Sequence, residues 1–199
     1  MVTEATVRES LRDEVVASVP GLSETIYEFW VPRTNERADL AAIGPAMWGY
    51  EIKTAQDTLR RLPRQVEAYN RLFDHCTVVL AERHLKAALT IVPEWWGAAV
   101  ILTDHVPLSF RLVRPASLNR SVDPETLVRL LWSQEVRSAL LAAGAEPDPK
   151  ASRASMWQQL LSLLDLEGLK GAVRRALLER NPSMVRFPNS RSSAFDITR

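Results

Sequence analysis

The sequence has one cysteine, three histidines and no long apolar run. A single cysteine excludes a disulfide framework within the chain, and Cys76, which precedes the apolar residues 78–80, is expected to be a buried strand thiol. His75, His84 and His105 show no ligand spacing and are expected to be structural. No apolar stretch approaches the ~18–20 residues that a bilayer span needs, so no membrane contact is expected.

The sequence also lacks a large excess of charge of either sign. The formal net charge is +1 over 199 residues, so no global field favours a polyanion. Charged residues crowd the first fourteen positions in place of a basic segment followed by an apolar core, which argues against a secretory signal. We therefore expect a cytoplasmic protein. A local excess of arginine and lysine in residues 150–199 could face a polyanion or could be a solvated surface.

The pattern of apolar residues predicts a mixed α/β region first. Apolar positions spaced as on one helix face predict a helix over about 4–18. Short apolar runs at 37–43 and 47–53 predict two antiparallel strands of a hairpin. Further elements are expected as a helix at about 63–73, a helical turn at 84–89, and strands near 76–81, 97–103 and 107–113. This order indicates a mixed central sheet flanked by helices.

From residue 124 onward the pattern is helical throughout, which predicts a second region. Helical periodicity covers 124–143, about 152–165 and about 167–180. Asp123 before Pro124 is typical of a helix start. We therefore divide the chain into an α/β core (1–118), a helical C-terminal region (119–182) and a flexible tail (183–199). The apolar stripe of the helical region suits packing within the chain, a homodimer or a partner protein.

One grouping of charged residues has a chemical use. Alternation along the second hairpin strand places Glu51 and Lys53 on one side, and the neighbouring strand can add Asp39. Hard divalent ions such as Mg²⁺ or Mn²⁺ take oxygen ligands, and the backbone carbonyl of Ile52 is a further candidate. Such an ion activates water against a phosphate, while Lys53 could orient that water. An acid and a base paired on an ordinary strand surface would show the same residues.

Three short segments in succession resemble the motifs of the PD-(D/E)XK nuclease superfamily. They are Arg-Ala-Asp-Leu (37–40), Gly-Tyr-Glu-Ile-Lys (49–53) and Gln-Val-Glu-Ala-Tyr (65–69). The third resembles the RecB-type branch in particular, and the chain as a whole resembles a small bacterial group of that superfamily. The resemblance covers roughly residues 24–81 and implies a restriction-endonuclease-like core.

The resemblance also implies roles for individual residues. Asp39 and Glu51 would hold the metal, and a further acid would come from the first motif. Glu28 is the candidate for that acid, with Glu24 in reserve if this segment is helical. The superfamily has a proline before the catalytic aspartate, and Ala38 stands in its place here.

The helix after the catalytic strand would complete the site. Gln65 and Tyr69 lie one turn apart on one side of it, and the resemblance places both among the catalytic residues. The start of a helix carries free N–H groups, where a phosphate could dock. Arg60, Arg61 and Arg64 could hold backbone phosphates or form a solvated face.

The sequence thus predicts a metal-dependent hydrolase that cuts phosphodiester bonds, of DNA rather than RNA, by attack of a metal-activated water. The alternative is a non-cleaving nucleic-acid-binding or regulatory module on a nuclease-like fold. Trp95 and Trp96 leave two interpretations open: they could stack on unpaired bases or plug the edge of a core.

Overall fold

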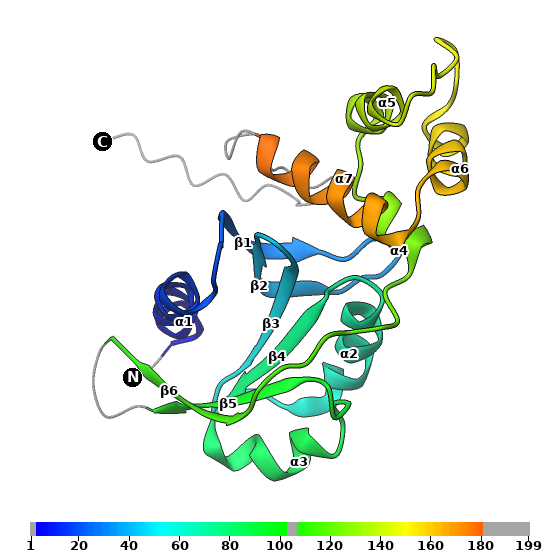
Figure 1. Ribbon diagram of the computed structural model, residues 1–199. Helices are drawn as coiled ribbons and strands as arrows, with labels where there is room; N and C mark the ends of the chain where they lie inside the picture. The colour runs from blue at the N-terminus through cyan, green and yellow to red at the C-terminus, as the bar shows by residue number, and fades with distance from the viewer. Residues whose placement is uncertain (1–2, 103–106, 181–199) are drawn as a thin grey trace, which may run out of the picture.

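The computed structural model describes residues 3–102 and 107–180, and it shows a six-stranded mixed sheet flanked by helices (Figure 1). The strands lie in chain order in the sheet: β1 (Glu24–Trp30), β2 (Arg37–Ile43), β3 (Met47–Lys53), β4 (His75–Leu80), β5 (Gly97–Leu102) and β6 (Ser109–Arg114). β3, β4 and β5 run parallel to one another, and the other neighbours are antiparallel. The expected mixed α/β fold with a helical C-terminal part is confirmed.

One helix covers each face of the sheet (Figure 1). The first is α1 (Glu4–Ser18), which begins where the hydroxyl of Thr3 accepts a hydrogen bond from the backbone N–H of Thr6, at 3.2 Å. Such a cap satisfies one of the free N–H groups at a helix start. The apolar side of α1 packs on the sheet in a cluster that includes Val7, Leu11, Leu40 and Ile52. The other face is covered by α2 (Leu62–Asn70).

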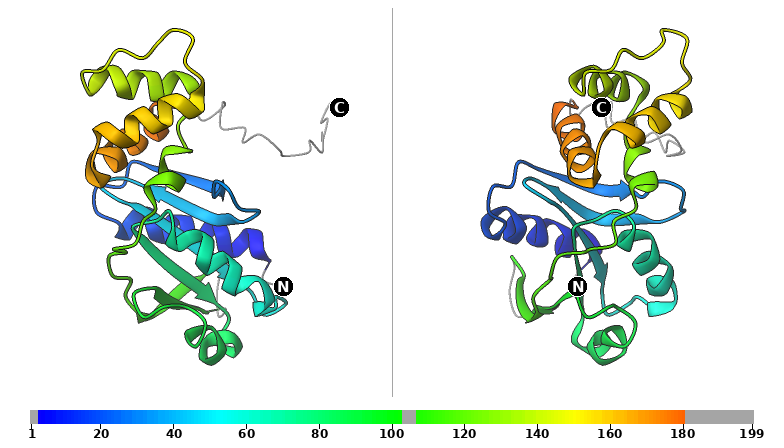
Figure 2. Two further views of the ribbon diagram at one scale, coloured as in Figure 1. Left: turned by 90° about the vertical axis from the view of Figure 1, so that its right-hand side faces the viewer. Right: turned by 45° about the vertical axis from the view of Figure 1, so that its right-hand side comes forward.

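The remaining helices follow the strands or form the C-terminal part. The connection from β4 to β5 contains the 3₁₀ turn η2 (Glu82–His84) and α3 (Leu85–Leu89), and a similar turn, η1 (Leu59–Arg61), precedes α2. The C-terminal part consists of α4 (Pro124–Val128), α5 (Ser133–Ala142), α6 (Arg153–Leu163) and α7 (Leu166–Glu179). These four helices gather at one end of the sheet (Figure 2).

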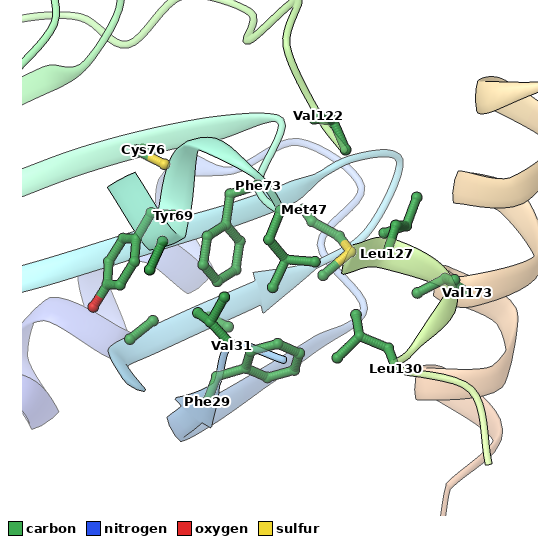
Figure 3. Packing of buried hydrophobic residues seen from close by; sticks show 14 of the residues in the cluster. Phe29, Val31, Met47, Tyr69, Phe73, Cys76, Val122, Leu127, Leu130 and Val173 are labelled. Carbon is green, nitrogen blue, oxygen red and sulfur yellow. The ribbon is translucent and has the colours of Figure 1, made fainter. Parts of the chain in front are cut away.

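The helical part shares a hydrophobic core with the α2 face of the sheet. Phe29, Met47 and Tyr69 belong to the same buried cluster as Leu127 and Val173, and Figure 3 shows this cluster extending from Tyr69 on α2 to Leu127 on α4 and Val173 on α7. The expected division of the chain near residue 118 therefore separates two regions that pack on each other. The expected flexible tail, 183–199, lies outside the described residues.

Two local expectations are corrected by the structure. Residues 24–30, considered as a helix when Glu24 was held in reserve, form edge strand β1. The single helix expected over 124–143 is two helices. Arg180, which is distant in the sequence, donates to the carbonyl of Leu130 at 2.5 Å, and the nearby Glu135 caps α5 by accepting from the N–H of Trp132 at 2.6 Å. Within the described ranges, no helix is long and apolar enough to cross a membrane.

Candidate functional site

The carboxylate of Glu51 is closed off by its own neighbours. It lies on β3, is 1% exposed, and faces α2. Lys53 donates to one carboxylate oxygen and the hydroxyl of Tyr69 donates to the other. Burial raises the pKa of Glu51, and the ammonium of Lys53 opposes that rise. Both oxygens therefore have strong partners within the protein, and neither faces solvent.

The side chain of Asp39 accepts a backbone hydrogen bond where the pairing of β2 with β3 ends. The paired residues of β2 and β3 stop at Leu40 and Tyr50, and beyond that point an oxygen of Asp39 accepts from the N–H of Ile52 at 2.6 Å. Burial, and after it the charge of Glu51, raise the pKa of Asp39 to about 8. A carboxyl group in such a site holds its proton at neutral pH.

A second group of acids meets on the other side of Asp39. Oxygens of Glu4, Glu28 and Asp39 all lie within 4.8 Å of one another. Glu28 has a positive φ of 51° and lies in β1 between the residues that pair with Ala38 and Leu40. The guanidinium of Arg8 lies 2.5 Å from Glu4 and 2.6 Å from Glu28. Arg8 thus already pairs with two of these three acids.

The predicted metal ligands already have partners within the chain. Both oxygens of Glu51 are bonded, Asp39 accepts from the N–H of Ile52, and Glu28 is paired with Arg8 and, at 3.4 Å, with Arg37. The predicted ligand atom of Ile52 is its carbonyl oxygen, whereas the atom that contacts Asp39 is its backbone N–H. The roles of Glu28, Asp39, Glu51 and Ile52 as ligands of Mg²⁺ or Mn²⁺ stay predictions, and no chemical step is derived from them.

Gln65 is the predicted site residue with an unused polar atom. It is 3% exposed and lies one helical turn before Tyr69 on α2. Among the described residues, its amide oxygen has no hydrogen-bond partner. A buried acceptor without a partner lowers stability by about 1–3 kcal/mol. The structure thus brings Glu51, Lys53 and Tyr69 together as the sequence predicted, and the catalytic roles of these residues and of Gln65 stay predictions.

The loops that follow β3 and β4 are bound to each other. The N–H of Ala81 donates to the carbonyl of Lys53 at 2.8 Å. A ring nitrogen of His84 lies 3.1 Å from the carbonyl of Thr54, and Arg83 donates to the carbonyl of Asp57 at 3.1 Å. These bonds hold the start of α2 and the η2–α3 segment at one end of the sheet, away from α4–α7 (Figure 1).

This end of the sheet is basic. Its exposed cationic side chains, which we call the basic end, are Arg33, Arg60, Arg61, Arg64, Arg83 and Lys86. Arg61 and Arg64 pair with the buried Glu36, at 2.9 and 3.7 Å, which places the turn between β1 and β2 at the same end. Within the part of the chain that is described, Arg33, Arg60 and Lys86 have no ion-pair partner.

The comparisons with known proteins decide the family. A family model described as Bacteriophage P4 protein cII matches residues 4–197. The chain belongs to this family. A curated relative, "Protein cII" of Enterobacteria phage P4, is 23% identical over 115 residues, which are 58% of this chain and 44% of that protein. The chain thus matches less than half the length of this relative. No solved structure matches at a significant level.

The family match overturns the resemblance on which the enzyme assignment rested. The prediction of a PD-(D/E)XK nuclease of the RecB-type branch is wrong, and so is the metal-dependent DNA hydrolase inferred from it, because the family found is that of phage P4 cII. The physical reason is that the three motifs specify only a few residues on a hairpin and the following helix, which many mixed sheets can present. Here Lys53 and Tyr69 donate hydrogen bonds to the two carboxylate oxygens of Glu51.

Several residues of interest were not found from the sequence. Glu4 and Arg8 join the acids of β1 and β2 only because α1 packs across the sheet. Arg83 and Lys86 join Arg60 because β3 and β4 are parallel and end together, and Arg33 joins them because the antiparallel strand β2 begins at that end. The sequence signal that could have predicted this basic group is the order of two apolar strands, β3 and β4, with a helix between them, which is typical of parallel pairing.

Proposed function

We propose that the chain is a nucleic-acid-binding regulatory module that does not cut its ligand, and that the basic end binds the phosphate backbone. One observation carries this proposal: Arg33, Arg60 and Lys86, exposed and without an ion-pair partner among the described residues, come from three segments at the end of the sheet where the parallel strands β3 and β4 finish. Open α/β sheets characteristically bind ligands at that edge. Arginine and lysine side chains that neutralise phosphates supply most of the non-specific affinity for nucleic acid.

The buried acids support binding without cleavage. Cleavage of a phosphodiester by activated water needs a free carboxylate to hold a metal ion or to take a proton. Glu51 is bonded to Lys53 and Tyr69, and an oxygen of Asp39 accepts from the N–H of Ile52. These groups stabilise the end of the hairpin in the present arrangement.

The aromatic residues support a duplex ligand over an unpaired strand. Trp96 is fully buried, donates from its indole N–H to Asn70 at 2.8 Å and stacks on Tyr69. Trp95 packs against Trp96, with ring centroids 6.0 Å apart. Stacking of unpaired bases needs exposed aromatic faces, and this pair instead plugs the core. We therefore propose duplex DNA, in preference to RNA, and a cytoplasmic location where DNA is accessible.

Binding of fluorescently labelled nucleic acid tests this function. Anisotropy would be measured with duplex DNA, single-stranded DNA and duplex RNA across a range of salt concentrations, in EDTA and in Mg²⁺. For the double variant Arg60→Ala/Lys86→Ala, loss of two phosphate contacts should reduce the log–log salt slope by about 2. Both side chains are exposed, so stability should change by less than about 0.5 kcal/mol each.

Arg120→Ala provides the matched control. Arg120 is also exposed, but its neighbour Asn119 donates to the carbonyl of Asp74, at the opposite end of β3. This variant should bind with the wild-type affinity and salt slope. An equal loss in the two variants, or an unchanged slope in both, would contradict the basic end as the binding surface. Degradation of the labelled duplex in Mg²⁺ would contradict binding without cleavage.

A further inference from the structure

A groove runs between α5 and α7 in the helical part, with a volume of about 1040 Å³. Its walls carry small side chains, among them Ala139 and Ala142 of α5 and Gly171, Ala172 and Ala176 of α7. Concave sites of this volume, with mostly apolar walls, commonly receive apolar groups. The groove is thus shaped for a narrow apolar segment.

Gly171 gives a second reason to expect an occupant. It lies within α7, where glycine is unfavourable relative to alanine, and a Cβ built on it meets nothing within 4 Å. No described residue therefore requires a glycine at this position. Glycine is required where another backbone approaches closely, and such an approach would come from whatever lies in the groove.

The chain itself continues from the mouth of this groove. Arg180, the last described residue, lines the groove and lies with its guanidinium 4.2 Å from the ring centroid of Trp132. The sequence continues to residue 199 with the apolar residues Met184, Val185 and Phe187 close to its start. The family match extends to residue 197, so this segment belongs to the shared sequence of the family.

We propose that residues 183–188 turn back at Pro182 and occupy the groove between α5 and α7, with Met184, Val185 and Phe187 as the anchoring side chains. The reach is sufficient. Gly171 lies nine residues before Arg180 on a helix, about 14 Å away at 1.5 Å per residue, and five extended residues span about 16 Å. An amphipathic segment that enters a groove between two helices is a common mode of recognition.

Cysteine pairing in the full chain tests the placement. Gly171→Cys would be combined with Val185→Cys, and Gly171→Cys with Ser193→Cys would be the control pair; the native Cys76 is buried. We expect an intrachain disulfide to form under mild oxidation at least about tenfold faster in the first pair, since the two sulfurs must approach within bonding geometry. Interchain disulfides would assign the groove to a second copy and overturn the proposal, and equal rates in the two pairs would overturn it as well.

Hydrogen exchange of the full chain tests the energetic contribution. Met184→Asp/Phe187→Asp should speed amide exchange in α5 and α7 at least about threefold, because a charged segment no longer covers the groove. Phe195→Asp, a matched apolar-to-acid change outside the anchoring segment, should leave that exchange unchanged. Exchange that is equal in wild type and both variants would overturn the proposal, since a partner protein or no occupant at all would give that result.

Discussion

The ammonium of Lys170 on α7 lies 2.8 Å from a carboxylate oxygen of Asp74, and both side chains are less than a tenth exposed. The other oxygen of Asp74 accepts from the N–H of Met47, at the first residue of β3, at 2.8 Å. The pair therefore joins the helical part to the sheet at the end opposite the basic end. A buried ion pair of this kind positions two regions relative to each other.

Removing one member of that pair should be costly. Lys170→Met keeps most of the apolar stem but leaves Asp74 charged and buried, so the free energy of unfolding should fall by about 3–5 kcal/mol. Urea unfolding followed by tryptophan fluorescence measures it. Lys150→Met, an exposed lysine in the same helical part, is the control and should change stability by less than about 0.5 kcal/mol. Equal stability of the two variants would show that the pair contributes nothing.

Asp39 should make the protein less stable as pH rises. Its pKa is about 8 in the folded protein and about 3.9 in an unfolded chain. Between these values the folded state holds a proton that the unfolded state releases. The contribution of Asp39 is therefore complete below about pH 4 and is lost as pH rises towards 8, at no more than about 1.4 kcal/mol per pH unit for one proton.

The matched variant for this pH dependence is Asp39→Asn, whose amide oxygen can still accept from Ile52. The groups whose charges act on Asp39 include Glu51, Lys53 and Glu4, together with Arg8 and Arg61, and Glu51 also has a raised pKa. The difference between wild type and Asp39→Asn isolates Asp39 from these neighbours. We expect urea midpoints of the wild type to decline more steeply between about pH 5 and pH 8 than those of the variant, and parallel curves would contradict a proton on Asp39.

Gln65 allows a structural role to be separated from a binding role. Gln65→Met removes the amide oxygen that has no partner among the described residues and keeps a side chain of similar length. Stability should rise, by up to about 1–3 kcal/mol, because an unsatisfied buried acceptor is removed. Thermal unfolding and nucleic-acid binding would be measured together. A drop in stability would show that the oxygen has a partner in solution.

The hairpin and the shared side of Glu51 and Lys53 were predictable because they depend on local spacing, whereas Tyr69 entered the predicted site only through the resemblance. Residues 37–43 and 47–53 alternate as strands do, and the structure has these bounds. Strand β1 was harder to predict, since Glu28, with its positive φ, lies in the middle of it. Local patterns determine which side of a strand a residue occupies, and they do not determine what covers that side.

The chemical state of the site could not be predicted for the same reason. Spacing places Glu51 and Lys53 near each other and says nothing of the burial that raises the pKa of Glu51. The pairing of Glu28 with Arg8 depends on a helix that crosses the sheet from the start of the chain. Three motifs in the right order therefore suggested free carboxylates, whereas in the structure Asp39 and Glu51 accept hydrogen bonds from other groups of the chain.

The packing of β3 against α2 leads to a last prediction, at Gly49. A Cβ at this position would lie 2.5 Å from the ring of Phe73, a ring that already contacts Tyr69, with centroids 5.4 Å apart. Gly49→Ala should therefore lower the free energy of unfolding by about 1–3 kcal/mol through overpacking. Because the clash is with one ring, Gly49→Ala/Phe73→Leu should lose less than the sum of the single variants. A double-mutant cycle from urea unfolding measures this, and strict additivity would show that the strain from Gly49→Ala lies in the backbone of β3 and not against Phe73.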